Sequence, residues 1–345
     1  MQELDVLIEV LKSKHDIDKE SIVKLLTCKE SKSIYAAADE VRSCVVGKEV
    51  HLRGLIEFSS YCCRTCFYCG LRSANSTLKR YRLEPKEILE CASRAVAYGL
   101  KTIVLQSGED KSYSINVLCK IVQAIKGMDV AVTLSIGELK RSEYAELKKA
   151  GADRYLLRIE TSNENLYNGL HPGMSYKNRV RCLYDLKELG YETGTGCLIG
   201  IPGQTIDMLA EDLLFFKKLD ADMIGMGPFI PCDGTPLEKS EGGKVDLVYR
   251  MMSLTRLFLP EVNMPVTTAL GVKDYNGYKN GLMCGANVIM PNMGMSEYKK
   301  MYAIYPGKGE SINNMENQIE NIKKVVFELG RSIGVDYGSR RKTTK

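Results

Sequence analysis

Three cysteines stand close together in the first quarter of the chain. Cys62, Cys66 and Cys69 have the spacing Cys-x3-Cys-x2-Cys within the segment SSYCCRTCFYCGLR. A structural zinc ion takes four ligands, and no fourth Cys or His stands at a matching spacing. Three thiolates suit three corners of a [4Fe–4S] cluster, and they leave the fourth iron open to chelate a small molecule. The spacing therefore favours an iron–sulfur cluster with one accessible iron over a zinc site or three unrelated thiols.

The composition indicates a protein of a reducing compartment. The chain has 345 residues, with 12 Cys, 3 His and no Trp. Its first segment, MQELDVLIEVLKSKHDID, mixes acidic and basic residues and lacks the apolar run of a signal peptide. No apolar stretch reaches the ~18 residues that a membrane-spanning helix needs. We therefore expect a cytoplasmic protein with mostly reduced cysteines and no membrane partner, and the net charge of +5 gives no reason to expect nucleic acid.

Alternating strands and helices must position the cysteines. Apolar runs predict eight strands, at 51–58, 101–107, 130–136, 153–159, 192–200, 222–228, 264–269 and 286–292. Amphipathic segments predict helices at 85–98, 113–127, 141–150, 176–189, 205–219, 243–258, 273–283 and 312–331. Eight such units predict an α/β fold with a closed (β/α)8 barrel of the TIM type, and an open doubly wound sheet is the rival. The cysteines follow the first strand, on the face where barrel enzymes carry their chemistry.

The chain divides into three predicted parts. Residues 1–48 read as a helical N-terminal extension, with apolar residues at helical spacing. Residues 49–331 form the predicted barrel, and residues 332–345 form a basic C-terminal tail. Its last residues, SRRKTTK (339–345), are expected to be a disordered and solvated end.

Two arginines lie in the fourth predicted strand. Arg154 and Arg158 are four residues apart, so their side chains face the same side of the strand. Both faces of a strand in a parallel barrel are buried, and an unpaired Arg there is costly. The pair predicts either a bound anion or buried ion pairs, with Glu57 as one partner. Thr267 and Thr268 on the seventh strand would add hydroxyl groups to such an anion site.

The cysteine motif resembles the signature of the radical S-adenosylmethionine (SAM) superfamily, in which an aromatic residue such as Tyr68 precedes the last Cys. The resemblance implies that the open iron binds the amino and carboxylate groups of SAM. It also implies that the reduced cluster cleaves SAM to a 5′-deoxyadenosyl radical. The SAM contacts that it implies are Tyr68, Gln106, Ser107 and Gly108 of the QSGED loop, Glu160 at the ribose, Arg179 at the methionyl carboxylate, and Ile201 of the GIPGQT loop.

A longer set of segments, over residues 50–308, resembles the HydE family of [FeFe]-hydrogenase maturases. It includes IEFSSYCCRTCFYCGLR, KTIVLQSGED, LKELGYETGTGCLIGIPGQT and CGANVIMPN. The resemblance implies an anaerobic maturase of the transferase class that works with the partners HydG and HydF and an electron donor such as ferredoxin or flavodoxin. Its implied substrate is a small cysteine-bound Fe(CO)2CN fragment. The residues implied to bind this fragment in the barrel are Arg154, Arg158, Thr267, Thr268, Tyr302 and Tyr305, although the two tyrosines could equally pack a core.

Related families leave other interpretations open. Biotin synthase and methylornithine synthase share parts of the pattern, so a radical SAM mutase or C–S bond-forming enzyme acting on an amino-acid-like substrate is the alternative function. An iron–sulfur scaffold without catalysis is a third hypothesis. The surroundings of Cys197 and Cys232 do not resemble the sulfur-donor site of biotin synthase, and we interpret both as packing residues. No Cys follows Cys284, which excludes the second three-cysteine cluster that some HydE proteins carry after their YPGK segment.

Overall fold

Six parallel strands form the main sheet. The computed structural model describes residues 3–308 and 315–342. The strands lie in the order β2 (Gly54–Ser59), β3 (Thr102–Ser107), β4 (Ala131–Ser135), β5 (Arg154–Leu156), β6 (Glu192–Thr195) and β8 (Met223–Ile224). All six residues of β2 are buried, as expected where helices cover one face of a parallel sheet and the interior lies on the other. This sheet holds the second, third and fourth of the predicted strands and parts of the first, fifth and sixth.

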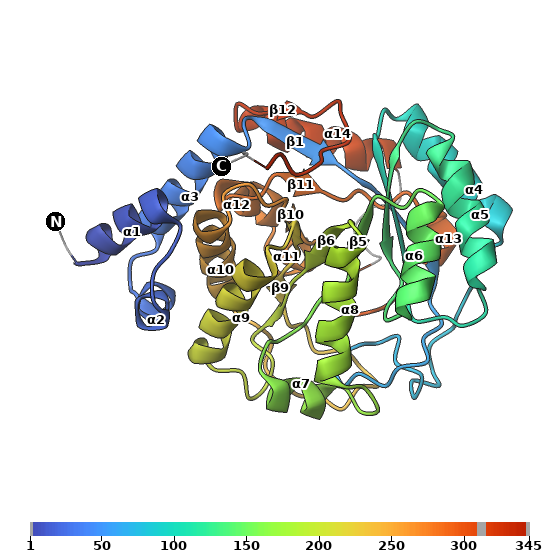
Figure 1. Cartoon of the computed structure of the whole chain (residues 1–345), viewed down its shortest axis with the longest axis horizontal. Coiled ribbons are helices and arrows are strands. Elements are labelled where there is room, and N and C mark those ends of the chain that lie inside the picture. Colours follow the sequence, from blue (N-terminus) through green and yellow to red (C-terminus); the bar gives the residue numbers. More distant parts are fainter. Residues whose placement is uncertain (1–2, 309–314, 343–345) are drawn as a thin grey trace.

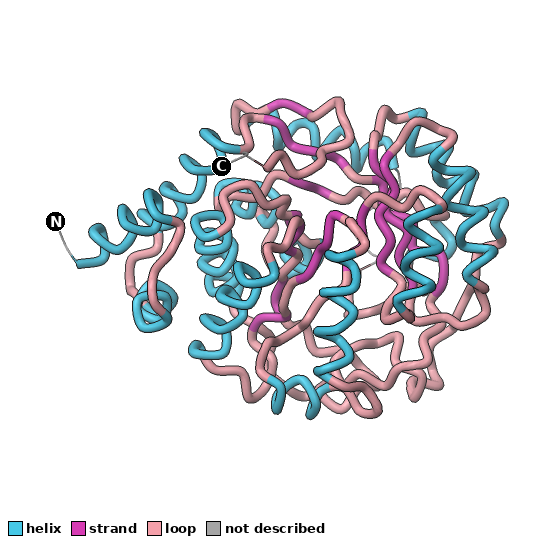
Figure 2. Tube along the Cα trace, viewed as in Figure 1, coloured by secondary structure: helices cyan, strands magenta, loops and turns pink. Residues whose placement is uncertain are grey.

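Short parallel pairs continue the ring of strands. β11 (Val288–Ile289) pairs with β10 (Pro265–Val266) and with β1 (Glu49–Leu52), and β7 (Leu198–Ile199) pairs with β9 (Gly227–Pro228). Single bridges, from Met223 to Asn263 and from Leu55 to Asn292, link the two edges of the main sheet to these pairs. The strands lie at the centre of the molecule and the helices outside them (Figures 1 and 2). The predicted α/β barrel fold is confirmed as a barrel-like parallel arrangement.

The predicted helices form the outer layer. Their observed bounds are α4 (Pro85–Ala97), α5 (Ile115–Lys126), α6 (Arg141–Lys149), α8 (Tyr176–Glu188), α9 (Ile206–Leu219), α10 (Val245–Phe258) and α14 (Met315–Glu328). The single helix predicted at 273–283 is wrong, because the chain forms α11 (Thr268–Lys273) and α12 (Gly277–Met283) with a turn between them. At that turn Gly277 lies so close to α11 that a Cβ would approach the Leu270 carbonyl oxygen to 2.7 Å. Among the described helices, none combines the length and hydropathy required to cross a bilayer.

Three helices precede the barrel. α1 (Glu3–Lys14), α2 (Lys19–Thr27) and α3 (Lys32–Val45) project to the left in Figure 1, with α2 packed on α9 and α3 packed on α10. Each has an apolar stripe that is buried, including Leu11, Ile22 and Ile34. These side chains belong to the same apolar cluster as the barrel core, so the extension is packed against the barrel wall.

The C-terminal segment is ordered through Lys342, so the prediction of a disordered tail is wrong for its described part. β12 (Ser332–Ile333) pairs in parallel with β1. Further on, the side chain of Arg340 is 8% exposed and its guanidinium lies 2.7 Å from Asp220 and 3.1 Å from Asp222. The basic composition of the segment suggested solvation, but Asp220 and Asp222, which pair with Arg340, are 120 and 118 positions earlier in the chain. Residues 343–345 lie outside the described part.

Two buried arginines of the barrel depend on this segment for acceptors. Arg154 donates to the carbonyl oxygen of Tyr337 at 2.7 Å, and Arg53 donates to that of Gly338 at 2.9 Å. Arg53 directly precedes β2, and Arg154 is the first residue of β5, so both lie at the N-terminal ends of the strands. The C-terminal segment therefore closes the end of the barrel that is opposite the catalytic face of such folds.

Candidate active site

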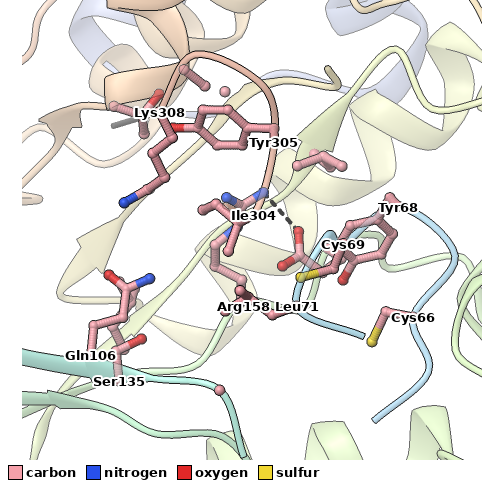
Figure 3. A pocket seen from close by; sticks show the side chains of 18 of the residues that line it. Cys66, Tyr68, Cys69, Leu71, Gln106, Ser135, Arg158, Ile304, Tyr305 and Lys308 are labelled. Carbon is pink, nitrogen blue, oxygen red and sulfur yellow. Dashed lines mark hydrogen bonds and ion pairs between the residues drawn. The ribbon is translucent and has the colours of Figure 1, made fainter. Parts of the chain in front are cut away.

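A cavity of about 310 Å³ lies at the carboxyl ends of the strands. The side chains that line it come from widely separated strands and loops (Figure 3). The residues named from the sequence that line this cavity are Cys62, Cys66, Tyr68, Cys69, Gln106, Ser107, Gly108, Arg158, Glu160, Arg179, Thr267, Thr268, Tyr302 and Tyr305. The fold thus brings the three cysteines, the implied SAM contacts and the implied substrate contacts to one place.

The three cysteines lie on the loop after β2, and backbone hydrogen bonds fix this loop. The amide of Cys63 donates to the Glu109 carbonyl, that of Phe67 to Leu170, and that of Gly70 to Ile304, each at 3.0 Å. These acceptors lie in three different parts of the chain. The loop is therefore held from three sides before any cofactor binds.

The chemistry of the thiols fits an iron–sulfur cluster. Burial, together with the nearby Cys62, raises the pKa of Cys66 to about 12, so the free thiol keeps its proton. A metal cation that replaces this proton removes that penalty. No three His, Cys, Asp or Glu side chains of the described residues are gathered closely enough to hold one metal ion. A cubane does not need such a gathering, because each of its irons takes one thiolate.

Gly108 allows the loop after β3 to approach the cysteine loop. A Cβ at this position would lie 2.3 Å from the carbonyl oxygen of Tyr61 and 2.7 Å from the Cβ of Cys62. No real Cβ tolerates such contacts, so one of the two loops would have to move.

We predict that Gly108→Ala lowers the iron content of anaerobically reconstituted protein by about tenfold, because loss of a supporting contact at a metal site costs about 10- to 100-fold in affinity. Iron and sulfide analysis with the visible absorption spectrum measures this. Gly169→Ala is the matched control, because a Cβ there meets nothing within 4 Å. Full iron content in the Gly108→Ala protein would contradict the prediction.

Tyr68 is held by a histidine that the sequence did not single out. The Tyr68 hydroxyl lies 2.8 Å from Nε2 of His171, and Nδ1 of His171 lies 2.7 Å from the carbonyl oxygen of Tyr167. Nδ1–H must donate to that carbonyl, so Nε2 accepts from Tyr68. Burial lowers the pKa of His171 to about 4, which keeps the ring neutral. His171 follows α7 (Glu164–Leu170), a short helix that periodicity did not predict.

Arg64, Glu109 and Arg179 line the cavity, and Glu138 contacts Arg179 from outside the lining. Arg64 donates to Glu109 at 2.5 Å, and Arg179 donates through Nε to Glu138 at 2.7 Å. The side chains of Arg179 and Glu138 are 8% and 4% exposed. Glu138 was missed in the sequence, although an acid shortly after the end of a barrel strand, here β4, is a recognisable signal.

Glu160 has a strained backbone. Its φ is 67°, in the left-handed region that residues other than glycine rarely adopt. The conformation is fixed from both sides, since the Glu160 amide donates to Gly196 and its carbonyl accepts from Leu198, both at 3.0 Å. Its carboxylate accepts from Arg158 at 2.7 Å. Such strain is typical of residues whose side chain must point into a functional site.

Part of the cavity wall carries hydroxyl groups. Thr268 and Tyr305 share a hydrogen bond of 2.5 Å between their hydroxyl groups, and Thr267 donates to the carbonyl of Met226 at 3.2 Å. Tyr302 is 2% exposed and Tyr305 lies beside it in the same loop. Both tyrosines line the cavity rather than packing only within the core.

The structure does not place Arg154 in the cavity. Arg154 has no exposed surface and pairs with Glu192 at 2.7 Å. Four residues along a strand span about 13 Å, so Arg158 reaches the cavity while Arg154 points to the opposite end of the barrel. The alternative of buried ion pairs is correct for Arg154, but Glu57 is not its partner, since Glu57 pairs with Lys308.

Ile201 also lies outside the residues that line the cavity. It is 2% exposed and belongs to a small apolar cluster with Leu170 and Phe229, against which Tyr68 packs. Cys197 and Cys232 are buried, at 0% and 6% exposure, and neither lines the cavity. Cys63 is exposed, so its side chain is directed away from its neighbours in the motif.

Comparison with known proteins decides the family. The sequence model of the radical SAM superfamily matches residues 56–216. The [FeFe] hydrogenase maturase subunit HydE of Thermotoga maritima is 51% identical over 312 residues, which cover 90% of each chain. The chain belongs to the HydE family. The 3-methylornithine synthase of Methanosarcina acetivorans, at 28% identity over 91% of this chain and 88% of its own, is a more distant relative of this HydE-family chain.

Solved structures agree with the fold. Methylornithine synthase (PylB) has a TM-score of 0.83 at 25% identity, with 95% of this chain and 97% of that chain covered. The maturase HydG from Carboxydothermus hydrogenoformans has a TM-score of 0.80 at 19% identity, covers 96% of this chain, and supports the fold alone. As a member of the HydE family, the chain is a radical SAM enzyme of [FeFe]-hydrogenase maturation. Its cofactors are a [4Fe–4S] cluster and SAM.

Proposed function

We propose that Cys62, Cys66 and Cys69 hold the cluster and that SAM binds between it and the polar side chains after β3, β4 and β5. The observation that carries this proposal is the shared cavity, which Cys66, Gly108, Glu160 and Arg179 all line. The bound cluster supplies the electron that cleaves SAM to methionine and the 5′-deoxyadenosyl radical. Radical chemistry of this kind is a property of the cofactor, and the protein contributes binding, orientation and exclusion of water.

The charged residues near the cysteines suit the two ends of SAM. Arg179, held by Glu138, presents a planar guanidinium that suits the methionyl carboxylate. The strained Glu160 directs a carboxylate into the cavity, where it suits the ribose hydroxyls. Gln106 and Ser107, with the close approach at Gly108, would complete the contacts to the amino group and the cysteine loop.

We propose a cysteine-bound Fe(CO)2CN fragment as the substrate. Arg158, Thr267, Thr268, Tyr302 and Tyr305 line the cavity and offer donors to its anionic groups. The chain would act in the cytoplasm with HydG and HydF as functional partners and with a ferredoxin or flavodoxin as electron donor. An amino-acid-like substrate is the second candidate, and the similarity to 3-methylornithine synthase over 91% of the chain favours it as the alternative.

The experiment combines cluster-loaded protein, SAM and a low-potential reductant under anaerobic conditions, with or without the synthetic cysteine-bound iron fragment. We expect 5′-deoxyadenosine in both cases and, when the fragment is present, an adenosylated product detected by mass spectrometry. Absence of 5′-deoxyadenosine would favour a non-catalytic scaffold. A 5′-deoxyadenosine yield that rises with a free amino acid, but not with the iron fragment, would favour the mutase alternative.

A further inference from the structure

Lys308 is a buried cation on the wall of the same cavity. Its side chain is 5% exposed, and its ammonium pairs with Glu57, whose side chain is 3% exposed. The other carboxylate oxygen of Glu57 accepts from Asn292 at 2.8 Å. Lys308 lines the cavity, whereas Glu57 and Asn292 are not among the residues that line it. The carboxylate therefore supports the ammonium from behind, and the ammonium is the group that meets a ligand.

The position of Lys308 in the cavity, as well as its charge, indicates what it can bind. Figure 3 shows its amine directed towards Gln106, on the side of the cavity away from Cys66 and Cys69. Glu57 on β2 is in register with Gln106 on β3, which explains why both side chains face this region. The amine also lies 4.9 Å from the centre of the Tyr302 ring, a distance at which the ring stabilises a cation.

Burying a lysine at this position costs free energy, because its ammonium group loses hydration. Burial lowers the pKa of Lys308 to about 7, and the pair with Glu57 opposes that shift by favouring the charged form. Lysine carries three N–H donors, and Glu57 needs one of them. A small ligand with an anionic group can use the others, and the low dielectric of a buried site makes such a hydrogen bond strong.

We propose that Lys308 anchors the α-carboxylate of an amino-acid-bearing substrate, at the end of the cavity away from the cluster. This assignment rests on the proposed function, because it takes the cysteine-bound iron fragment as the ligand. With the carboxylate held at Lys308, the metal end of the fragment points back towards the cysteine loop. Glu57 and Asn292 are positioning residues that keep the ammonium charged and directed into the cavity.

Equilibrium binding tests this assignment without turnover. The protein is loaded with its cluster and SAM, and two synthetic iron fragments are titrated anaerobically by calorimetry. One fragment carries cysteine, and the other carries cysteamine, which lacks the carboxylate. We expect wild-type protein to prefer the cysteine fragment by about 10- to 100-fold, the range of a charge-assisted hydrogen bond. In Lys308→Met this preference should fall to about one, and Lys308→Arg should retain part of it.

Three further variants serve as controls for this test. The double variant Lys308→Met/Glu57→Gln leaves no unpaired charge in the interior. It replaces the single variant if Lys308→Met does not fold, and it should lose the preference for the cysteine fragment equally. Glu57→Gln alone should weaken the preference, because the lysine loses its support. Lys126→Met is the matched control, since Lys126 pairs with Asp153 at 2.9 Å with side chains 30% and 36% exposed, outside the cavity lining. It should keep the full preference.

The outcomes separate this assignment from the proposed function. Lys308→Met protein that still prefers the cysteine fragment would overturn the assignment, as would wild-type protein that binds both fragments equally. Wild-type protein that shows the preference but converts neither fragment would overturn the proposed reaction and leave Lys308 as a carboxylate anchor.

Discussion

Replacing Cys66 with Ala is expected to abolish 5′-deoxyadenosine formation. The proposed cluster has three protein ligands, and a cubane held by two thiolates loses iron. We expect product formation to fall by more than about 100-fold, beyond the range for loss of a supporting residue around a metal. Product is measured by chromatography after anaerobic reduction with SAM, together with iron content and the electron paramagnetic resonance spectrum of the reduced protein.

Cys63→Ala provides the matched control for this prediction. Cys63 lies in the same loop, is exposed, and does not line the cavity. It should retain wild-type iron content and product formation. If Cys63→Ala and Cys66→Ala lost activity equally, the loop would be sensitive to any change and the assignment of ligands would not stand.

Replacing Arg154 with Met is expected to lower the free energy of unfolding by about 3–5 kcal/mol, the cost of breaking a buried ion pair by removing one partner. Arg154 pairs with Glu192 and donates to Tyr337 and Ser339, so the variant loses the attachment of the C-terminal segment as well as the ion pair. Urea unfolding followed by circular dichroism measures the change, with a shift of the midpoint at constant slope.

Arg158→Met separates the two roles that the sequence assigned to this pair of arginines. Arg158 lines the cavity and its side chain is 25% exposed. It should raise the KM for the iron fragment by about tenfold, as expected for loss of one charge-assisted hydrogen bond, with a small change in stability. Arg154→Met should lower the free energy of unfolding strongly and leave the KM for the iron fragment nearly unchanged. A raised KM in folded Arg154→Met protein would place Arg154 at the substrate after all.

Local patterns carried most of what could be predicted. The strand–helix alternation led to the correct fold class, and the cysteine spacing indicated an iron–sulfur cluster. The resemblance of longer segments to known families led to the correct family and to SAM as the second cofactor. Gly108, Glu160 and Arg179 were named from the family resemblance, and the structure brings all three to the cavity.

Residues defined by distant partners were harder to predict. Three further residues are recognisable only by the residues that they contact: Glu138 by Arg179, His171 by Tyr68, and Lys308 by Glu57. No local sequence pattern connects the members of these pairs. Arg154 was misplaced for a related reason. The alternation of side chains along a strand predicts which face of the strand a residue lies on. It does not predict whether the side chain lies near the carboxyl end or the amino end of the barrel.

The C-terminal segment has a consequence for synthesis of the protein. Arg53, near the start of the barrel, donates a hydrogen bond to the carbonyl oxygen of Gly338, which is 285 positions later in the sequence. The segment that carries Gly338 is synthesised after the strands of the barrel, so those strands emerge from the ribosome before this acceptor is available. Contacts this distant in sequence slow folding. The nascent chain therefore exposes an incomplete barrel with accessible thiols, and protection of those thiols from oxygen and stray metals is needed most in that interval.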